Sequence, residues 1–208
     1  MGRGVFVTFE GPDGSGKSTQ IKLLRDFLVG EGRDAVMARE PGGTEIGEQI
    51  RDVILDKDNV GMCGMTEALL YAAARAQLVS QVIRPNLDAG KIVICDRFAD
   101  SSTVYQGYGR GLAEAVEAIN AYAMMGCAPD LTFLLKVPPE TGASRRANRS
   151  NDRIESEARA YHDAVYEAYM ALERKHPGRI VGIDGTQEVG RISEIIKERL
   201  EEFLKGEG

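Results

Sequence analysis

The sequence predicts an α/β fold with a five-stranded parallel sheet and helices on both of its faces. Two observations favour it: short runs rich in β-branched and aromatic residues recur along the chain, and stretches of helical periodicity separate them. Strands that alternate with helices are typical of parallel sheets, because a parallel connection must cross back over a face of the sheet. The 208 residues suit one domain, residues 1–208, without a linker or an internal repeat.

The elements follow from these two patterns in chain order. Strands are expected at residues 5–10, 35–39, 91–95, 131–137 and 179–183, where Val, Ile, Leu and Phe are concentrated. Helices are expected where apolar residues recur every three or four positions, as Ile21, Leu24 and Leu28 do before Gly30 ends the first one. The later helices are expected at residues 46–55, 66–87, 112–125, 155–175 and 189–204.

Between the first strand and the first helix, residues 11–18 fit the Walker A pattern of a phosphate-binding loop (P-loop). Glycines let successive backbone N–H groups turn toward phosphate oxygens, and the helix start adds further donors. Lys17 is expected to reach the β- and γ-phosphates, and the Ser18 hydroxyl to bind Mg²⁺. We therefore predict a P-loop NTPase fold in which a nucleotide binds at Gly11, Asp13, Gly14, Ser15, Gly16, Lys17, Ser18 and Thr19.

Charge and cysteine usage exclude several classes of protein. The net charge of −6 argues against unspecific binding to nucleic acid or acidic membranes. Of the 26 basic residues 18 are arginines, which favour planar, bidentate binding of phosphates and carboxylates. Cys63, Cys95 and Cys127 are far apart and odd in number, so we expect neither a disulfide framework nor a zinc site. Without an apolar signal region or membrane span, a cytoplasmic protein is expected.

Residues 144–153 contain four arginines and almost no apolar side chains, so they cannot belong to the core. A solvated surface loop is the ordinary interpretation of such a segment. Beside a P-loop, we interpret residues 144–154 as a mobile lid that neutralises charge and excludes water when it closes. This segment is called the lid below.

Four more patterns occur in a recognisable order: Arg39-Glu40-Pro41-Gly42-Gly43-Thr44, Tyr71-Ala72-Ala73-Ala74-Arg75, Asp96-Arg97-Phe98 followed by Ser101-Ser102-Thr103-Val104-Tyr105-Gln106-Gly107, and Asp152-Arg153-Ile154-Glu155. Together they resemble the thymidylate kinase family over nearly the whole chain. The resemblance implies transfer of the γ-phosphoryl group of ATP to dTMP, giving dTDP for dTTP synthesis, with Mg²⁺ as cofactor. By analogy it also implies a homodimer.

The resemblance assigns roles to individual residues of the acceptor and donor sites. It implies that Asp13 contacts the sugar 3′-hydroxyl of dTMP, Arg97 the phosphate and Arg75 the O4 edge of thymine. Tyr71 is expected to stack on the base, although many members have phenylalanine at this position. Further expected contacts are Ser102 with the base, Tyr105 with the sugar, Asp96 with Mg²⁺, Arg39 with phosphate and Asp184 near the adenine.

Members of the family place a catalytic arginine either in the P-loop or in the lid. Here Gly14 follows Asp13, so the charge is expected from the lid. Arg149 and Arg153 are the candidates, whereas Arg145 and Arg146 can still belong to the preceding helix. Each assignment has a structural alternative: a loop-capping Asp13, an Asp96–Arg97 pair at a strand end, a plain turn after Arg39 or at Asp184, and Tyr71 and Arg75 as core residues.

Two other functions stay open from the residues alone. A P-loop kinase for another small acceptor would carry the same donor loop. A nucleotide-switched module that hydrolyses ATP or GTP slowly would also carry it, although we find no Asn-Lys-x-Asp guanine motif in this sequence.

Overall fold

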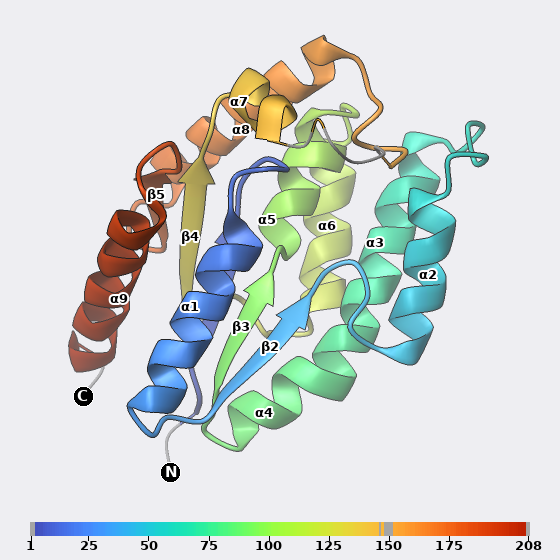
Figure 1. Cartoon of the computed structure of the whole chain (residues 1–208). Coiled ribbons are helices and arrows are strands. Elements are labelled where there is room, and N and C mark those ends of the chain that lie inside the picture. The colour runs from blue at the N-terminus through green and yellow to red at the C-terminus, as the bar shows by residue number, and fades with distance from the viewer. Residues whose placement is uncertain (1–2, 146, 148–151, 207–208) are drawn as a thin grey trace.

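The computed structural model describes residues 3–145, 147 and 152–206 and contains a five-stranded parallel sheet (Figure 1). The strands are β1 (Phe6–Glu10), β2 (Ala35–Arg39), β3 (Ile92–Asp96), β4 (Leu131–Lys136) and β5 (Ile180–Asp184). Their order is β2-β3-β1-β4-β5, and every neighbouring pair is parallel. The five predicted strands are therefore confirmed, with ends that differ by at most one residue.

Apolar side chains on both faces of the sheet form the core, because successive residues of a strand point to opposite sides. Val7 and Phe9 of β1 pack in one cluster with residues of α1 (Lys17–Gly30) and α9 (Val189–Gly206). Phe6 packs in a second cluster on the other face. Figure 1 shows α1 and α9 together on one side of the sheet. The central strand β1, which leads into the P-loop, is thus held from both sides.

The other face is covered by helices that follow β2 and β3. These are α3 (Gly64–Leu78), the π-helical turn η1 (Val79–Ile83), α4 (Arg84–Asp88), α5 (Ala99–Ser102), the π-helical turn η2 (Thr103–Tyr108) and α6 (Ala113–Met124). The helix predicted at residues 66–87 is thus interrupted by a wider turn just before Pro85. Proline lacks a backbone N–H group, so the regular hydrogen bond cannot form there. Helix α2 (Glu45–Leu55) packs against α3.

The helix predicted at residues 155–175 begins later, as α8 (Arg159–Lys175). Asp152 and Glu155 exchange hydrogen bonds: the Glu155 N–H donates to Asp152 Oδ1 (2.8 Å) and the Asp152 N–H to Glu155 Oε2 (3.1 Å). This reciprocal pattern resembles a capping box, and it closes a turn of its own before α8. Within the lid, the structure describes residues 144, 145, 147 and 152–154, and its mobility stays a prediction.

All carboxyl ends of the parallel strands lie at one edge of the sheet. Glu10, Arg39, Asp96 and Asp184 end four of the strands there, and the arrows in Figure 1 point toward α7 (Pro139–Arg145) and the segment before α8. Ligands of open α/β sheets bind at this edge. None of the helices that the structure describes is both long and apolar enough to cross a membrane.

Candidate active site

The P-loop joins β1 to α1 with a backbone that glycine alone adopts easily. Gly14 has φ +82°, and a Cβ atom there would lie 2.5 Å from the Gly142 carbonyl oxygen of α7. Gly16, with φ +95°, immediately precedes α1. The left-handed backbone and the close approach of α7 explain why side chains are excluded. The loop and its flanks line a cavity of about 540 Å³, here called the donor cavity.

Lys17 is nearly buried, with 7% exposure, at the start of α1. Its Nζ donates to the carbonyl oxygens of Gly11 (2.9 Å) and Pro12 (3.0 Å) in its own loop. Burial, together with the charge of Arg97, lowers the pKa of the Lys17 ammonium group to about 8. The loop carbonyls offer Nζ only the partial negative charge of their dipoles. A bound polyphosphate would place full negative charges beside Nζ.

Ser18 and Asp96 bring two oxygen ligands together at the base of the donor cavity. The Ser18 hydroxyl donates to Asp96 Oδ2 over 3.0 Å, although the two residues lie on different elements, α1 and β3. Hydroxyl and carboxylate oxygens are ligands that Mg²⁺ prefers, and Mg²⁺ usually completes its shell with water and substrate phosphates. The pair therefore fits the predicted metal site. The described residues contain no cluster of three or more His, Cys, Asp or Glu side chains able to hold a metal.

A second pocket, of about 90 Å³, adjoins the donor cavity and is here called the acceptor pocket. Tyr71, Arg97 and Tyr105 line it, as expected from the sequence. The donor cavity and the acceptor pocket share the lining residues Asp13, Glu40, Arg51, Arg97 and Asp152. The two cavities therefore meet directly in front of the P-loop.

Arg97 occupies this meeting point with a fixed side chain. Its backbone is left-handed (φ 66°), and its Nη2 donates to Asp13 Oδ1 over 2.6 Å. Nη1 donates to the hydroxyls of Ser101 (3.1 Å) and Tyr169 (3.2 Å), and the guanidinium carbon lies 5.2 Å from the centre of the Tyr105 ring. A non-glycine residue with positive φ is strained and is found mainly where function requires it. Asp13 and Arg97, expected at the sugar and the phosphate of the acceptor, thus form an ion pair with each other beside the P-loop.

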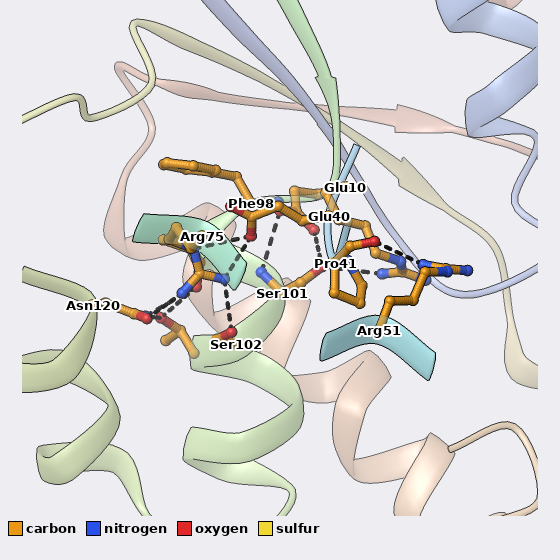
Figure 2. Close-up of polar contacts among 12 residues, drawn as sticks. Glu10, Glu40, Pro41, Arg51, Arg75, Phe98, Ser101, Ser102 and Asn120 are labelled. Atoms are coloured by element: carbon orange, nitrogen blue, oxygen red, sulfur yellow. Dashed lines mark hydrogen bonds and ion pairs between the residues drawn. The ribbon is translucent and has the colours of Figure 1, made fainter. Parts of the chain in front are cut away.

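Arg75 and Ser102, which were expected to contact the base, are not among the residues that line the acceptor pocket. Arg75 is 1% exposed, and its Nε and Nη2 donate to Glu40 Oε2 over 3.0 and 2.8 Å (Figure 2). Its remaining contacts go to Asn120 Oδ1 (2.6 Å) and to the Ser102 hydroxyl (2.9 Å). Attraction between the buried carboxylate and guanidinium draws Arg75 into the core, behind Glu40.

Glu40 stands between Arg75 and the acceptor pocket, whose wall it helps to form. Both donors from Arg75 bind its Oε2, and the buried Oε1 has no hydrogen-bond partner among the described residues. Burial raises the pKa of the Glu40 carboxyl to about 7, although Arg75 opposes the shift. A donor from a ligand in the pocket would satisfy this oxygen.

The lid arginines are arranged differently from expectation. Arg153 donates from Nη2 to Glu67 Oε2 (2.8 Å) and from Nε to the Ile54 carbonyl (2.8 Å), so it does not face the P-loop. Arg145, the less favoured candidate, donates to the carbonyls of Gly185 (3.1 Å) and Gly14 (3.3 Å) and lines the donor cavity. Arg149 and Arg146 lie outside the described residues.

Two further predicted residues lie at the rim of the donor cavity. Arg39 lines the donor cavity and donates to Glu48 Oε2 over 2.7 Å, with about half of its side chain exposed. Asp184 accepts from the backbone N–H of Thr186 (2.9 Å) and from its hydroxyl (2.6 Å), which closes the turn after β5. Arg145 donates to Gly185 in this same turn. The turn therefore lies beside the P-loop, where an adenine ring was expected.

Arg51 and Gln106 line this site, although the sequence analysis assigned neither of them a role. Arg51 on α2 lines both cavities and donates to the Pro41 carbonyl over 2.9 Å (Figure 2). Its position three residues after Glu48 is typical of an exposed helical ion pair, so no local pattern indicated a role in the site. Gln106 lines the acceptor pocket and donates to Glu67 Oε1 over 2.9 Å. Gln106 lies within the Ser101–Gly107 pattern, and this pattern could have indicated that Gln106 belongs to the site.

A family model described as thymidylate kinase matches residues 9–196. A thymidylate kinase of Caldanaerobacter subterraneus subsp. tengcongensis is 47% identical over 98% of this chain and 98% of its own. One of Symbiobacterium thermophilum is 49% identical over 96% of this chain and 94% of its own.

The fold agrees with a solved relative. The crystal structure of a thymidylate kinase from Ehrlichia chaffeensis matches with a TM-score of 0.78 at 30% identity, over 96% of this chain and 99% of that one. This likeness confirms the predicted P-loop NTPase fold. Sequence and structure together show that the chain belongs to the thymidylate kinase family.

Proposed function

We propose that this chain transfers the γ-phosphoryl group of ATP to dTMP and releases ADP and dTDP. The observation that carries the proposal is the junction of the two cavities at Asp13, Glu40, Arg51, Arg97 and Asp152. Nucleotides bound in them would meet phosphate to phosphate, as an in-line transfer requires. Membership of the thymidylate kinase family supports dTMP as the acceptor.

On the donor side, the P-loop amides and Lys17 bind the polyphosphate, and Lys17 Nζ leaves its loop carbonyls to do so. Ser18 and Asp96 would hold Mg²⁺, which when bound neutralises phosphate charge during transfer. Arg145 and the turn at Asp184 lie where they can frame the adenine. Their proximity to Gly14 and to each other supports this part of the proposal.

On the acceptor side, Arg97 and Arg51 bind the phosphate of dTMP and Asp13 the sugar 3′-hydroxyl. Tyr105 lies beside the sugar, and Tyr71 stacks on the base. Burial raises the pKa of both phenols above the ordinary value, so each ring stays uncharged. Arg75 and Ser102 stay proposed base contacts, which requires the guanidinium of Arg75 to be shared between Glu40 and the base.

We treat the chain as one kinase domain whose lid supplies Arg149 to the transferred phosphoryl group. The absence of a basic residue next to Asp13 in the P-loop, where Gly14 stands, supports a lid arginine. Such an arginine contributes about a thousandfold or more in turnover. Replacing Arg149 by methionine should therefore lower kcat by about this factor without changing the KM for ATP.

The test is an ATP-dependent phosphorylation assay with a panel of nucleoside monophosphates. Phosphorylation of dTMP should exceed that of CMP and AMP, and Arg97→Met should abolish it while ATP still binds. A matched control is Arg199→Met, because Arg199 forms an exposed pair with Glu202 on α9, away from both cavities. Activity on CMP or AMP without activity on dTMP would reject the proposal.

We also propose a homodimer that acts in the cytoplasm, where ATP and dTMP are supplied. Exposed apolar side chains on two helices of one face support the dimer: Leu69 on α3 is 51% exposed and Tyr122 on α6 is 85% exposed. Apolar surface of this kind is typical of protein contacts. Sedimentation of the pure chain should give twice the mass of 22.6 kDa, and Tyr122→Glu with Leu69→Glu should halve it.

A further inference from the structure

Glu67 is a carboxylate that is 1% exposed on α3, and the proposed reaction gives it no role. Its Oε1 accepts from Gln106 Nε2 (2.9 Å) and Arg110 Nε (3.3 Å). Its Oε2 accepts from Arg110 Nη2 (3.1 Å) and Arg153 Nη2 (2.8 Å). A buried carboxylate with charged donors on both oxygens fixes the position of each donor.

The donors come from parts of the chain that are distant in sequence. Gln106 belongs to η2 and lines the acceptor pocket. Arg153 belongs to the end of the lid, and Asp152 and Ile154 on either side of it line the same pocket. The two neighbours of Arg153 thus face the pocket, while the Arg153 side chain points away from the pocket and contacts the buried Glu67.

Arg153 and Arg110 fasten this segment at several points. The backbone N–H of Arg153 donates to the Leu55 carbonyl (3.4 Å), and its Nε donates to that of Ile54 (2.8 Å), both at the end of α2. Arg110 also donates to Glu157 Oε1 over 2.6 Å, and its guanidinium carbon lies 4.7 Å from the centre of the Tyr161 ring. The chain from residue 153 to residue 161 is therefore attached to the pocket wall through these contacts.

The charges of this cluster are balanced, with Glu67 and Glu157 opposite Arg110 and Arg153. Burial by itself raises the pKa of the Glu67 carboxyl, but hydrogen bonds from Arg110, Gln106 and Arg153 outweigh it and hold the pKa below its ordinary value. Glu67 is thus ionised at neutral pH. Its removal would leave two guanidinium groups without their shared partner.

We propose that Glu67 is a positioning residue that completes the acceptor pocket by holding the end of the lid against Gln106. Arg153 is the latch of this arrangement and does not act on the phosphates. The latch keeps Asp152 and Ile154 in the pocket wall, so the acceptor pocket is already formed when the acceptor nucleotide binds. The inference deepens the proposed function, on which its kinetic part rests.

The first test follows amide hydrogen exchange of residues 152–161 without any nucleotide. In Glu67→Gln and in Arg153→Met, exchange in this segment should accelerate about tenfold or more, because its side-chain attachments are lost. Exchange in residues 5–21 should stay unchanged in both. Arg191→Met, which removes an exposed arginine paired with Glu194 on α9, is the matched control and should change neither segment.

The second test is steady-state kinetics. Glu67→Gln and Arg153→Met should each raise the KM for dTMP about tenfold, with the KM for ATP within about twofold of wild type, since only the acceptor pocket is incomplete. The double variant should be no worse than the poorer single variant, because both changes open one latch. A structural defect without a pocket role would move both KM values together.

Three outcomes overturn the inference. Unchanged exchange at residues 152–161 in Arg153→Met refutes the latch, and this variant decides the matter if Glu67→Gln does not fold. A loss of kcat of about a thousandfold in Arg153→Met, with Glu67→Gln unaffected, would assign Arg153 to the phosphates instead. If the effects of the two changes on the KM for dTMP add up in the double variant, Glu67 and Arg153 act independently and do not form one latch. Because exchange is measured without substrate, its outcome is independent of which monophosphate the chain phosphorylates.

Discussion

ATP binding at pH 8.5 should be accompanied by uptake of a proton at Lys17. In the ligand-free chain burial and the charge of Arg97 set the pKa of this ammonium group to about 8. At pH 8.5 about one quarter of the molecules would then carry the proton. Phosphate oxygens beside Nζ raise the pKa toward the ordinary value of about 10.4 or above it, so nearly all ATP-bound molecules carry it. The difference is about three quarters of a proton per ATP bound.

Isothermal titration calorimetry measures this quantity directly. ATP with Mg²⁺ is titrated into the chain at pH 8.5 in two buffers of different ionisation enthalpy, and the difference in binding heat gives the number of protons. The terminal phosphate of ATP is fully ionised at this pH, so it contributes no proton. At pH 7 the uptake should fall to about 0.1, because Lys17 is then already protonated before ATP binds.

The control is Lys17→Arg, which keeps the positive charge but does not titrate in this range. Its binding heat should be independent of the buffer at both pH values. Equal proton uptake in wild type and Lys17→Arg, or none in wild type at pH 8.5, would refute the claim that the P-loop lowers the pKa of Lys17.

The remaining predictions concern stability and metal dependence. Gly14→Ala and Gly16→Ala each place a side chain at positive φ, which costs about 1–2 kcal/mol of unfolding free energy. In urea unfolding, Gly14→Ala should lose about 1–3 kcal/mol more than Gly16→Ala, because its Cβ atom would overlap Gly142. Equal losses in the two variants would contradict this reasoning. The raised pKa of Glu40, about 7, means that its contribution to stability is complete below its ordinary pKa of 4.5 and is lost as the pH rises through about 7. Glu40→Gln should remove this part of the pH dependence, on the order of a few kcal/mol, and an unchanged stability curve between pH 4.5 and 7 would argue against it. Asp96→Asn should raise the Mg²⁺ concentration needed for half-maximal activity about tenfold, because an amide oxygen is a weaker ligand than a carboxylate, and an unaltered Mg²⁺ titration would exclude Asp96 from the metal site.

Local patterns were sufficient for the fold because each element carries its own signal. The run Ile92-Val93-Ile94-Cys95 is a strand in the structure, and the helix that follows the P-loop ends at Gly30 as predicted. Two of the departures occur where one residue changes the hydrogen bonding of its neighbours. The π-helical turn before Pro85 is one such place, and the Asp152–Glu155 turn, which delays α8 to Arg159, is the other.

Some residues of the candidate site were likewise predictable from local patterns, and others were not. Lys17, Ser18 and Asp96 lie as their spacing predicts, since a P-loop and a strand end fix them through the backbone. Arg75 and Arg153 were predicted as ligands of substrate groups, and in the structure each donates to a buried glutamate that the sequence analysis did not connect with it. Helical spacing shows which face an arginine occupies, and it carries no information about a carboxylate that folding brings to that face from elsewhere.

The sequence by itself therefore determined the parallel sheet, the P-loop and the residues that its backbone presents, because short-range periodicity and glycine conformations encode them. The tertiary structure alone decided which carboxylate each arginine meets. Glu40 comes to Arg75 from the end of β2, and Glu67 meets Arg153 across 86 positions of the chain. The partner of a long side chain is set by the balance of burial, charge and packing across the whole fold, which no local pattern contains.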